Sequence, residues 1–450
     1  MRWLMCVLMI AACDGKTGTY HVSLVTAPGS HVLDAVTRAK LVLTDPFTIV
    51  ESDRGADGSF ALDLSVDAHG TNAVILFEGL DANQNVIAWG RTPGLPVAAI
   101  DASLAIDVAP PLSFTAAPAA LDPPRAELGV APLAYGVLFA GGADATGAPR
   151  ADVVVYNSYD HVLQKGLDLP APRAALSAMT GSTGYTYFFG GRDAAGQPTS
   201  TFWRFDTTVA PAGAYLDLSD MSMASYARAG ASATPIGGEL FVVAGTPPVL
   251  LDGTTTRTAA VSTPPAIGGL ATSVIVGTNE EAVFVGEGAG ATGIAIFSAT
   301  GYVEVAAPAD AIRTGHGIAA ADDGSILEVG GAVQGTLVAS GLRIDPVGPA
   351  ASSIANVLET PRKDAAVAAV GTLLVVAGGT DASGNVLANA EILDLPTLTH
   401  HATIPLAVPR TGAQAITLPD GQVLVAGGRD MTGAPIGTIE LFTGPVPALQ

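Results

Sequence analysis

The sequence predicts an all-β chain whose larger part is a repeat of seven strand-rich units. Three observations lead to this prediction: glycine doublets end short apolar runs at intervals of 42 to 54 residues, β-branched runs bounded by Gly, Pro, Asp and Asn dominate, and amphipathic helical periodicity is nearly absent. A strand repeat of this period indicates propeller blades. The doublets are Gly141-Gly142, Gly190-Gly191, Gly330-Gly331, Gly378-Gly379 and Gly427-Gly428, with degraded copies at Ala244-Gly245 and Gly286-Glu287.

An arginine marks the start of six of these units, 16 or 17 residues before the doublet. Between the arginine and the doublet lie two strand-like runs joined by a turn, such as Ala413–Thr417 and Gln422–Ala426 around Pro419-Asp420-Gly421. A third strand follows the doublet and a fourth leads to the next arginine. Each unit is therefore expected to be a four-stranded antiparallel sheet. The arginines are Arg125, Arg173, Arg228, Arg313, Arg362 and Arg410.

Four of the doublets open the same loop, Gly-Gly-x-Asp-x-x-Gly. Glycine allows positive φ, and an aspartate side chain caps the backbone of a turn. The aspartates are therefore expected to have a structural role in turns. They are Asp144, Asp193, Asp381 and Asp430.

The repeat resembles the kelch family over roughly residues 111–450. The resemblance rests on the glycine doublets, on the aromatic-aspartate pair Phe205-Asp206, and on the proline-arginine pairs such as Pro361-Arg362. It implies a seven-bladed kelch-like β-propeller. Kelch propellers include binding proteins and enzymes alike, so the resemblance specifies the fold better than the function.

The last unit is one strand short, because the chain ends soon after the strand expected at Thr438–Phe442. The segment Pro111–Pro124 aligns with the strand and proline-arginine boundary before Arg410. We therefore expect this segment to complete the C-terminal blade by pairing with Thr438–Phe442, which would remove exposed sheet edges.

Residues 20–109 are expected to form a separate β-sandwich, Ig-like or transthyretin-like, because short strands alternate there with turn signals. The turns are expected at Gly55–Gly58 and Asp81–Asn85. The expected strands are Tyr20–Thr26, Arg38–Thr44, Ser59–Leu64, Ala73–Glu78, Val86–Arg91 and Ala102–Val108.

Residues 1–13 resemble the signal peptide and lipobox of bacterial lipoproteins. Arg2 precedes the apolar run Trp3–Ala12, and Ile10-Ala11-Ala12-Cys13 has small residues before the cysteine. The resemblance implies that Cys13 is the lipid attachment site and that the protein is extracytoplasmic, anchored to the inner or outer bacterial membrane. The alternatives are a buried strand, or a cleaved signal with a free thiol.

The composition limits the classes of partner that the protein is expected to bind. The net charge of −21 disfavours nucleic acid. The mean hydropathy is +0.43, but the longest uncharged stretches are too short for a spanning helix, so the lipid is expected to be the only membrane contact. We expect a monomer without a cofactor. A copper radical oxidase is excluded because no cysteine lies in the repeat, and the histidines lack metal-site spacing, with His316 expected to be structural.

The arginines are the most notable polar set, because six of them should surround one end of the propeller channel. They could bind a carboxylate or a sugar acid, or each could pair with a carbonyl or a carboxylate of a neighbouring blade, which we favour. No residue is assigned a catalytic role. The expected function is a protein- or glycan-binding platform. The alternative is a carbohydrate-processing enzyme, a hydrolase, lyase or isomerase, acting at the channel mouth.

Overall fold

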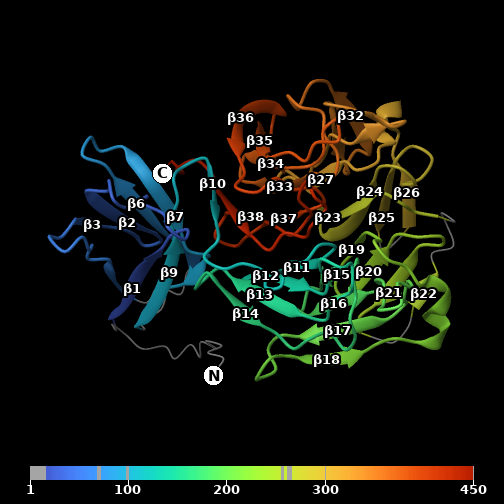
Figure 1. Ribbon diagram of the computed structural model, residues 1–450, viewed down its shortest axis with the longest axis horizontal. Helices are drawn as coiled ribbons and strands as arrows, with labels where there is room; N and C mark the ends of the chain where they lie inside the picture. Colours follow the sequence, from blue (N-terminus) through green and yellow to red (C-terminus); the bar gives the residue numbers. More distant parts are fainter. Residues whose placement is uncertain are drawn as a thin grey trace.

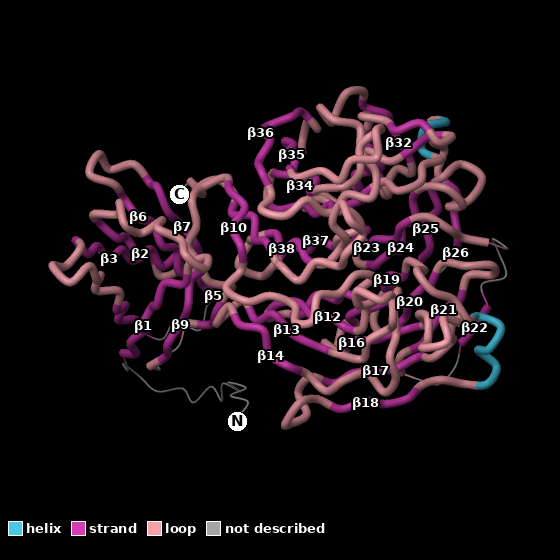
Figure 2. Tube along the Cα trace, viewed as in Figure 1, coloured by secondary structure: helices cyan, strands magenta, loops and turns pink. Residues whose placement is uncertain are grey.

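The computed structural model describes residues 17–67, 72–97, 101–254, 258–260, 266–298 and 301–448. The signal sequence and the lipid attachment site expected at Cys13 lie outside these residues. Strands and loops make up nearly all of the described chain, and its helices are two short 3-10 turns, η1 (Met221–Tyr226) and η2 (Ala309–Ala311) (Figure 2). Within the described ranges, no helix is long and apolar enough to cross a membrane.

Most of the N-terminal strands form two sheets that enclose one apolar core, and two short strands form a third sheet. The core includes Leu41, Leu64, Phe77 and Ile106, and strand β9 pairs in parallel with β1. One sheet has the order β4 (Asp63–Asp67), β1 (Thr17–Val25), β9 (Ala102–Asp107). The other has the order β3 (Phe47–Asp53), β2 (Arg38–Thr44), β6 (Ile75–Leu80), β7 (Val86–Arg91), and β5 (Asn72–Ala73) pairs with β8 (Leu95–Pro96).

In this region one expected strand was wrong and one observed strand was not expected. The strand expected at Ser59–Leu64 begins only at Asp63, because Asp57 accepts hydrogen bonds from the backbone N–H and hydroxyl of Ser59 and keeps that segment in a turn. Strand β3 was not expected. It is an edge strand in which exposed and half-buried residues alternate, but Phe47 and Ile49 lie on the exposed face. The sequence therefore shows no alternation of apolar and polar residues there.

Seven four-stranded antiparallel sheets follow among the described residues (Figure 1). Sheet 1 consists of β11 (Gly129–Leu133), β12 (Gly136–Ala140), β13 (Val153–Asn157) and β14 (Val162–Lys165). Sheet 2 consists of β15 (Ser177–Thr180), β16 (Thr186–Phe189), β17 (Phe202–Asp206) and β18 (Ala214–Asp217). Sheet 3 consists of β19 (Ala233–Pro235), β20 (Leu240–Val243), β21 (Val249–Asp252) and β22 (Thr258–Ala260). Sheet 4 consists of β23 (Leu270–Val276), β24 (Asn279–Val285), β25 (Ile294–Ser298) and β26 (Gly301–Glu304). Sheet 5 consists of β27 (Gly317–Ala320), β28 (Ile326–Val329), β31 (Gly341–Asp345) and β32 (Ala350–Ile354). Between β28 and β31, the chain forms a separate hairpin of β29 (Ala332–Val333) and β30 (Thr336–Leu337). Sheet 6 consists of β33 (Ala366–Val370), β34 (Leu373–Ala377), β35 (Asn389–Asp394) and β36 (Thr399–Pro405). Sheet 7 consists of β37 (Gln414–Thr417), β38 (Val423–Ala426), β39 (Glu440–Thr443) and β10 (Ser113–Ala116).

Sheet 7 combines strands from the two ends of the repeat, as expected. Strand β10 lies antiparallel to β39, with Phe114 opposite Phe442 and their ring centroids 5.3 Å apart. The outer edge of the C-terminal sheet is thus covered by a strand that precedes the first repeat unit. This pairing ties residues more than 300 positions apart in the sequence.

Each sheet packs against the next through a shared apolar cluster. Sheets 7 and 1 also share one, in which Leu424 and Leu441 meet Val137 and Phe139. The first strands of successive sheets contact one another from β11 through β37. The core of the repeat therefore lies between the sheets rather than in one place.

The glycine doublets explain how each unit connects to the next. Gly378 and Gly379 have φ of +66° and +95°, and a Cβ on Gly378 would lie 2.2 Å from the carbonyl oxygen of Arg410. The backbone N–H of Gly379 donates to that same carbonyl at 2.8 Å. The doublet is therefore required because the backbone of the following unit approaches too closely for a side chain.

Candidate functional site

The six arginines predicted from the repeat lie where the chain passes from one sheet into the next. Five of them are buried and Arg228 is half-buried. Arg125 shows the common arrangement, in which its Nη1 donates to the carbonyl oxygens of Gly141 at 2.9 Å and Asp152 at 2.8 Å. Arg313 contacts Gly330 and Ser340 in the same way, and Arg362 contacts Gly378 and Asn389. The guanidinium groups thus bridge the second and third strands of a sheet where the doublet separates them.

Three of the arginines also form ion pairs: Arg313 pairs with half-buried Asp310 at 2.9 Å, and Arg362 and Arg410 pair with buried glutamates. Arg362 Nη2 lies 2.5 Å from Glu391 Oε1, and Arg410 Nη2 lies 2.5 Å from Glu440 Oε1. Both carboxylates also accept backbone N–H groups, as Glu440 does from Ala407 at 2.8 Å. Burial lowers the pKa of Arg362 and Arg410, while the adjacent glutamate opposes this shift. Sequence reasoning missed both glutamates, although each is an acidic residue within an apolar third strand.

The remaining arginines use aromatic rings and local carbonyls. The guanidinium of Arg173 lies over Trp203 at 4.9 Å from the ring centroid, and it donates to the carbonyl of Pro172. Arg228 lies over Tyr226 and donates to its carbonyl. All six arginines are thus engaged by groups of this chain. These contacts favour the structural role over a ring of arginines open to an anionic ligand.

The four loop aspartates cap the backbone of their own turns. Asp381 is typical: its Oδ1 accepts the N–H of Ser383 at 2.8 Å and of Asn385 at 2.9 Å. Hydrogen bonds from the side chains of Thr146, Asn385 and Thr432, together with the backbone N–H groups, lower the pKa of Asp144, Asp381 and Asp430, because they favour the charged form. The loops of Asp144, Asp193 and Asp430 repeat the two backbone contacts.

Sheet 5 contains an acid and an imidazole at positions that are apolar in the well-preserved units. Glu328 lies on β28 and is buried, and its Oε1 lies 3.6 Å from Nδ1 of buried His316. Its Oε2 lies 3.8 Å from Nε of Arg313. Burial raises the pKa of Glu328 to about 8, and burial together with Arg313 lowers the pKa of His316 to about 4. Both shifts favour the neutral form of the group, because burial disfavours a charge.

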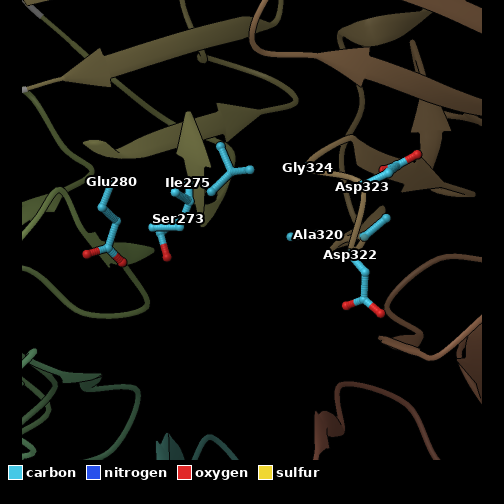
Figure 3. Close-up of a pocket in the computed structure, with 9 residues that line it drawn as sticks. Ser273, Ile275, Glu280, Ala320, Asp322, Asp323 and Gly324 are labelled. Carbon is cyan, nitrogen blue, oxygen red and sulfur yellow. The ribbon is translucent and has the colours of Figure 1, made fainter. Parts of the chain in front are cut away.

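A cavity of about 410 Å³ lies between the β23–β24 hairpin of sheet 4 and the β27–β28 turn of sheet 5. Figure 3 shows Ser273 and Glu280 on one side and Asp322 on the other, with Asp323 turned away from them. Asp323 is held by Ser325 and Arg343. Within the described chain, the carboxylates of Glu280 and Asp322 form no hydrogen bond or ion pair. Ile275, which also borders the cavity, is 63% exposed. Sequence reasoning did not single out this cavity, because sheet 4 lacks the repeat arginine that would have drawn attention to it.

Metal ligands do not gather in the part of the chain that the structure describes: it contains no group of three or more His, Cys, Asp or Glu residues able to hold an ion. His400, one of the adjacent histidines, contacts Thr403 and lies 3.4 Å from Glu359.

Comparison with protein families finds a Kelch motif at residues 361–401, the segment from Pro361 through β33, β34 and β35 to the start of β36. A Kelch motif within an all-β chain of four-stranded antiparallel sheets is consistent with a kelch propeller. The comparison with curated proteins gives no match.

Proposed function

We propose that this chain is an extracytoplasmic bacterial lipoprotein whose seven sheets are the blades of one closed kelch-like propeller, and that the propeller is a binding platform. Closure is supported by the apolar cluster shared between sheets 7 and 1 and by the pairing of β10 with β39. The engagement of the repeat arginines within the chain supports a scaffold role for that end of the propeller, which leaves binding to another surface.

The observation that carries the binding role is the cavity between sheets 4 and 5. Glu280 and Asp322 face it from different sheets, and exposed Ile275 provides an apolar wall. Such a surface suits a basic side chain of a protein partner, whose charged end would meet the carboxylates while its aliphatic stem covers the isoleucine. An acidic glycan would be repelled. Of the two expected ligand classes, the geometry therefore favours a protein with an exposed basic segment.

The double variant Glu280→Gln/Asp322→Asn is expected to weaken binding of a lysine-rich peptide about two- to thirtyfold, because each exposed charge pair contributes roughly 0.2–1 kcal/mol. Binding to the wild type should also weaken as salt is raised. Isothermal titration measures both effects. The matched control is Asp345→Asn, an exposed acidic residue that does not line the cavity. Equal binding by the double variant and the wild type, or tighter binding of an oligogalacturonate than of the peptide, would remove the basic-partner assignment.

The lipid anchor is tested at Cys13. Cys13→Ser is expected to abolish labelling by a palmitate analogue and to release the protein from the membrane fraction, because the thioether bond to the lipid can no longer form. Labelling and cell fractionation measure this in cells that produce the full chain. The control is Cys6→Ser, which lies within the expected signal sequence and should leave labelling unchanged. Recovery of unlabelled wild-type protein with a free Cys13 thiol would contradict the lipoprotein proposal.

A further inference from the structure

The N-terminal sheets are held against sheets 7 and 1 by hydrogen bonds that cross between the two parts of the chain. Trp89 Nε1 donates to the carbonyl of Gly444 at 2.9 Å, and the hydroxyl of Tyr159 donates to the carbonyl of Gly94 at 2.9 Å. The ring of Tyr159, from the β13–β14 turn, also packs against the N-terminal core. We call this contact region the junction. In Figure 1 it lies where the blue N-terminal strands meet β10.

Two buried carboxyl groups meet at the junction, one from each part of the chain. Asp107 ends β9 and is 3% exposed, and Asp420 lies in the β37–β38 turn and is 2% exposed. Gln422 connects them: its side-chain Nε2 donates to Asp107 Oδ1 at 3.0 Å and its backbone N–H donates to Asp420 Oδ1 at 3.0 Å. Two buried acids therefore contact one residue, Asp107 through the side-chain amide of Gln422 and Asp420 through its backbone N–H.

The polar atoms left over at this position are acceptors. Asp420 Oδ2 and Gln422 Oε1 are buried without a hydrogen-bond partner. Gln422 Nε2 already contacts Asp107 Oδ1 and the hydroxyl oxygen of Thr443. A buried carboxylate without a donor is costly, whereas a protonated carboxyl supplies a donor of its own. A proton retained on Asp420 would therefore turn its orphaned Oδ2 from an acceptor into a donor.

We propose that the junction is proton-controlled: Asp107 and Asp420 retain protons that hold the N-terminal sheets against sheets 7 and 1, and loss of these protons loosens the contact. Loosening follows because two adjacent carboxylates would then repel each other in a buried site. The two parts of the chain would remain folded, since each has its own apolar core.

The charged and titratable neighbours agree with this assignment. Burial raises the pKa of Asp107 to about 6 and that of Asp420 to about 7, and the proximity of Asp107 adds to the shift at Asp420. Arg91 opposes the shift at Asp420 and donates to its backbone carbonyl. The remaining neighbours are buried Tyr156, whose pKa burial raises, together with Asp160 and His161.

His161 is neutral over the relevant pH range, because burial lowers its pKa to about 4. Its Nε2 accepts the backbone N–H of Asp107 at 3.1 Å, so its Nδ1 carries the proton and donates to the hydroxyl oxygen of Tyr156. The pKa values of both aspartates are raised above the usual value near 4. Their stabilising contribution is therefore complete below pH 4 and is lost as pH rises through about 6 and 7. On the acid side, protonation of buried His161 limits the pH range over which the junction is stable.

Hydrogen exchange of the full chain at pH 5.5 and pH 8 tests the proposal, with protection factors corrected for the intrinsic effect of pH. In the wild type, junction amides such as those of Trp89, Asp107 and Gln422 are expected to lose on the order of tenfold protection at pH 8. A carboxyl pKa that is one unit higher in the closed junction than in the open junction changes the opening equilibrium about tenfold. Amides of β16, remote from the junction, serve as the internal reference. Asp420→Asn, which keeps the turn cap and removes the charge, is expected to retain its protection at pH 8.

The matched control is Asp323→Asn, because Asp323 holds the same turn position in sheet 5 but is exposed. It should keep the wild-type pH response. Asp107→Asn tests the other acid and replaces the first variant if Asp420→Asn does not fold. Equal junction protection at both pH values in the wild type, or a wild-type response in both asparagine variants, overturns the proposal. Restoration of wild-type protection at pH 8 by Ca²⁺ also overturns it, because a metal ion would then occupy the position of the proton.

Discussion

Arg410→Ala is expected to lower the free energy of unfolding by about 3–5 kcal/mol, because it leaves the buried carboxylate of Glu440 without its cation. It also removes a donor from the carbonyl of Thr438. Thermal and denaturant unfolding of the purified protein measure the loss. Arg410→Lys should restore only part of the stability, since an ammonium group cannot bond the carboxylate and the carbonyl in the fixed geometry of the guanidinium.

Two further variants separate the ion pair from other effects of the substitution. Arg410→Ala should cost less in a Glu440→Gln background, because no buried charge is then left unpaired. Arg429→Ala is the matched control: Arg429 is half-buried and pairs with Glu127 at 3.0 Å, so its loss should cost about 0–1 kcal/mol. If Arg410→Ala melts like the wild type and binding of an acidic glycan is lost, the arginines form a ligand site and the structural role is wrong.

Glu328→Gln is expected to stabilise the protein above about pH 8, on the order of a few kcal/mol relative to the wild type. The pKa of Glu328 is raised in the folded state, so its favourable contribution is complete below its unfolded pKa near 4.5 and is lost as pH rises through about 8. Glutamine has nearly the same shape and cannot ionise. Unfolding free energies measured from pH 6 to pH 9 should therefore decline less steeply in the variant.

Glu391→Gln is expected to change the stability in the opposite direction. Glu391 is also a buried glutamate of a repeat sheet, but it pairs with Arg362 and should be needed in its charged form. That variant should be less stable than the wild type at pH 7. If Glu328→Gln instead follows the wild-type pH profile, Glu328 is ionised and paired with Arg313 throughout.

The repeat made much of the fold predictable. The regular spacing of doublets and arginines located seven units of four strands, and the missing last strand pointed to the segment that contains β10. These features are readable because each unit needs the same local devices: glycine where neighbouring backbones approach, and a donor where the second and third strands separate. Edge strand β3 was not predictable, because its exposed face carries Phe47 and Ile49 and gives no regular pattern.

The candidate sites were less accessible from the sequence. The arginines and loop aspartates could be listed by position, but their partners could not, since Glu391 and Glu440 come from strands about 30 residues away. The cavity bounded by Glu280 and Asp322 lies between sheets 4 and 5, and none of the residues that line it belongs to a motif of the repeat. A carboxylate that faces a cavity has the same sequence signature as one that faces bulk water.

The sequence by itself determined the strand repeat, the turn chemistry of its loops and the order in which the units follow, because these depend on neighbours within one unit. Only the tertiary structure decided which ionisable groups lose their contact with water. Asp420 and Asp323 occupy equivalent turns, yet the N-terminal sheets bury the first and leave the second exposed. Charge depends on desolvation and on groups brought together from distant segments, and such proximity is a property of the folded chain.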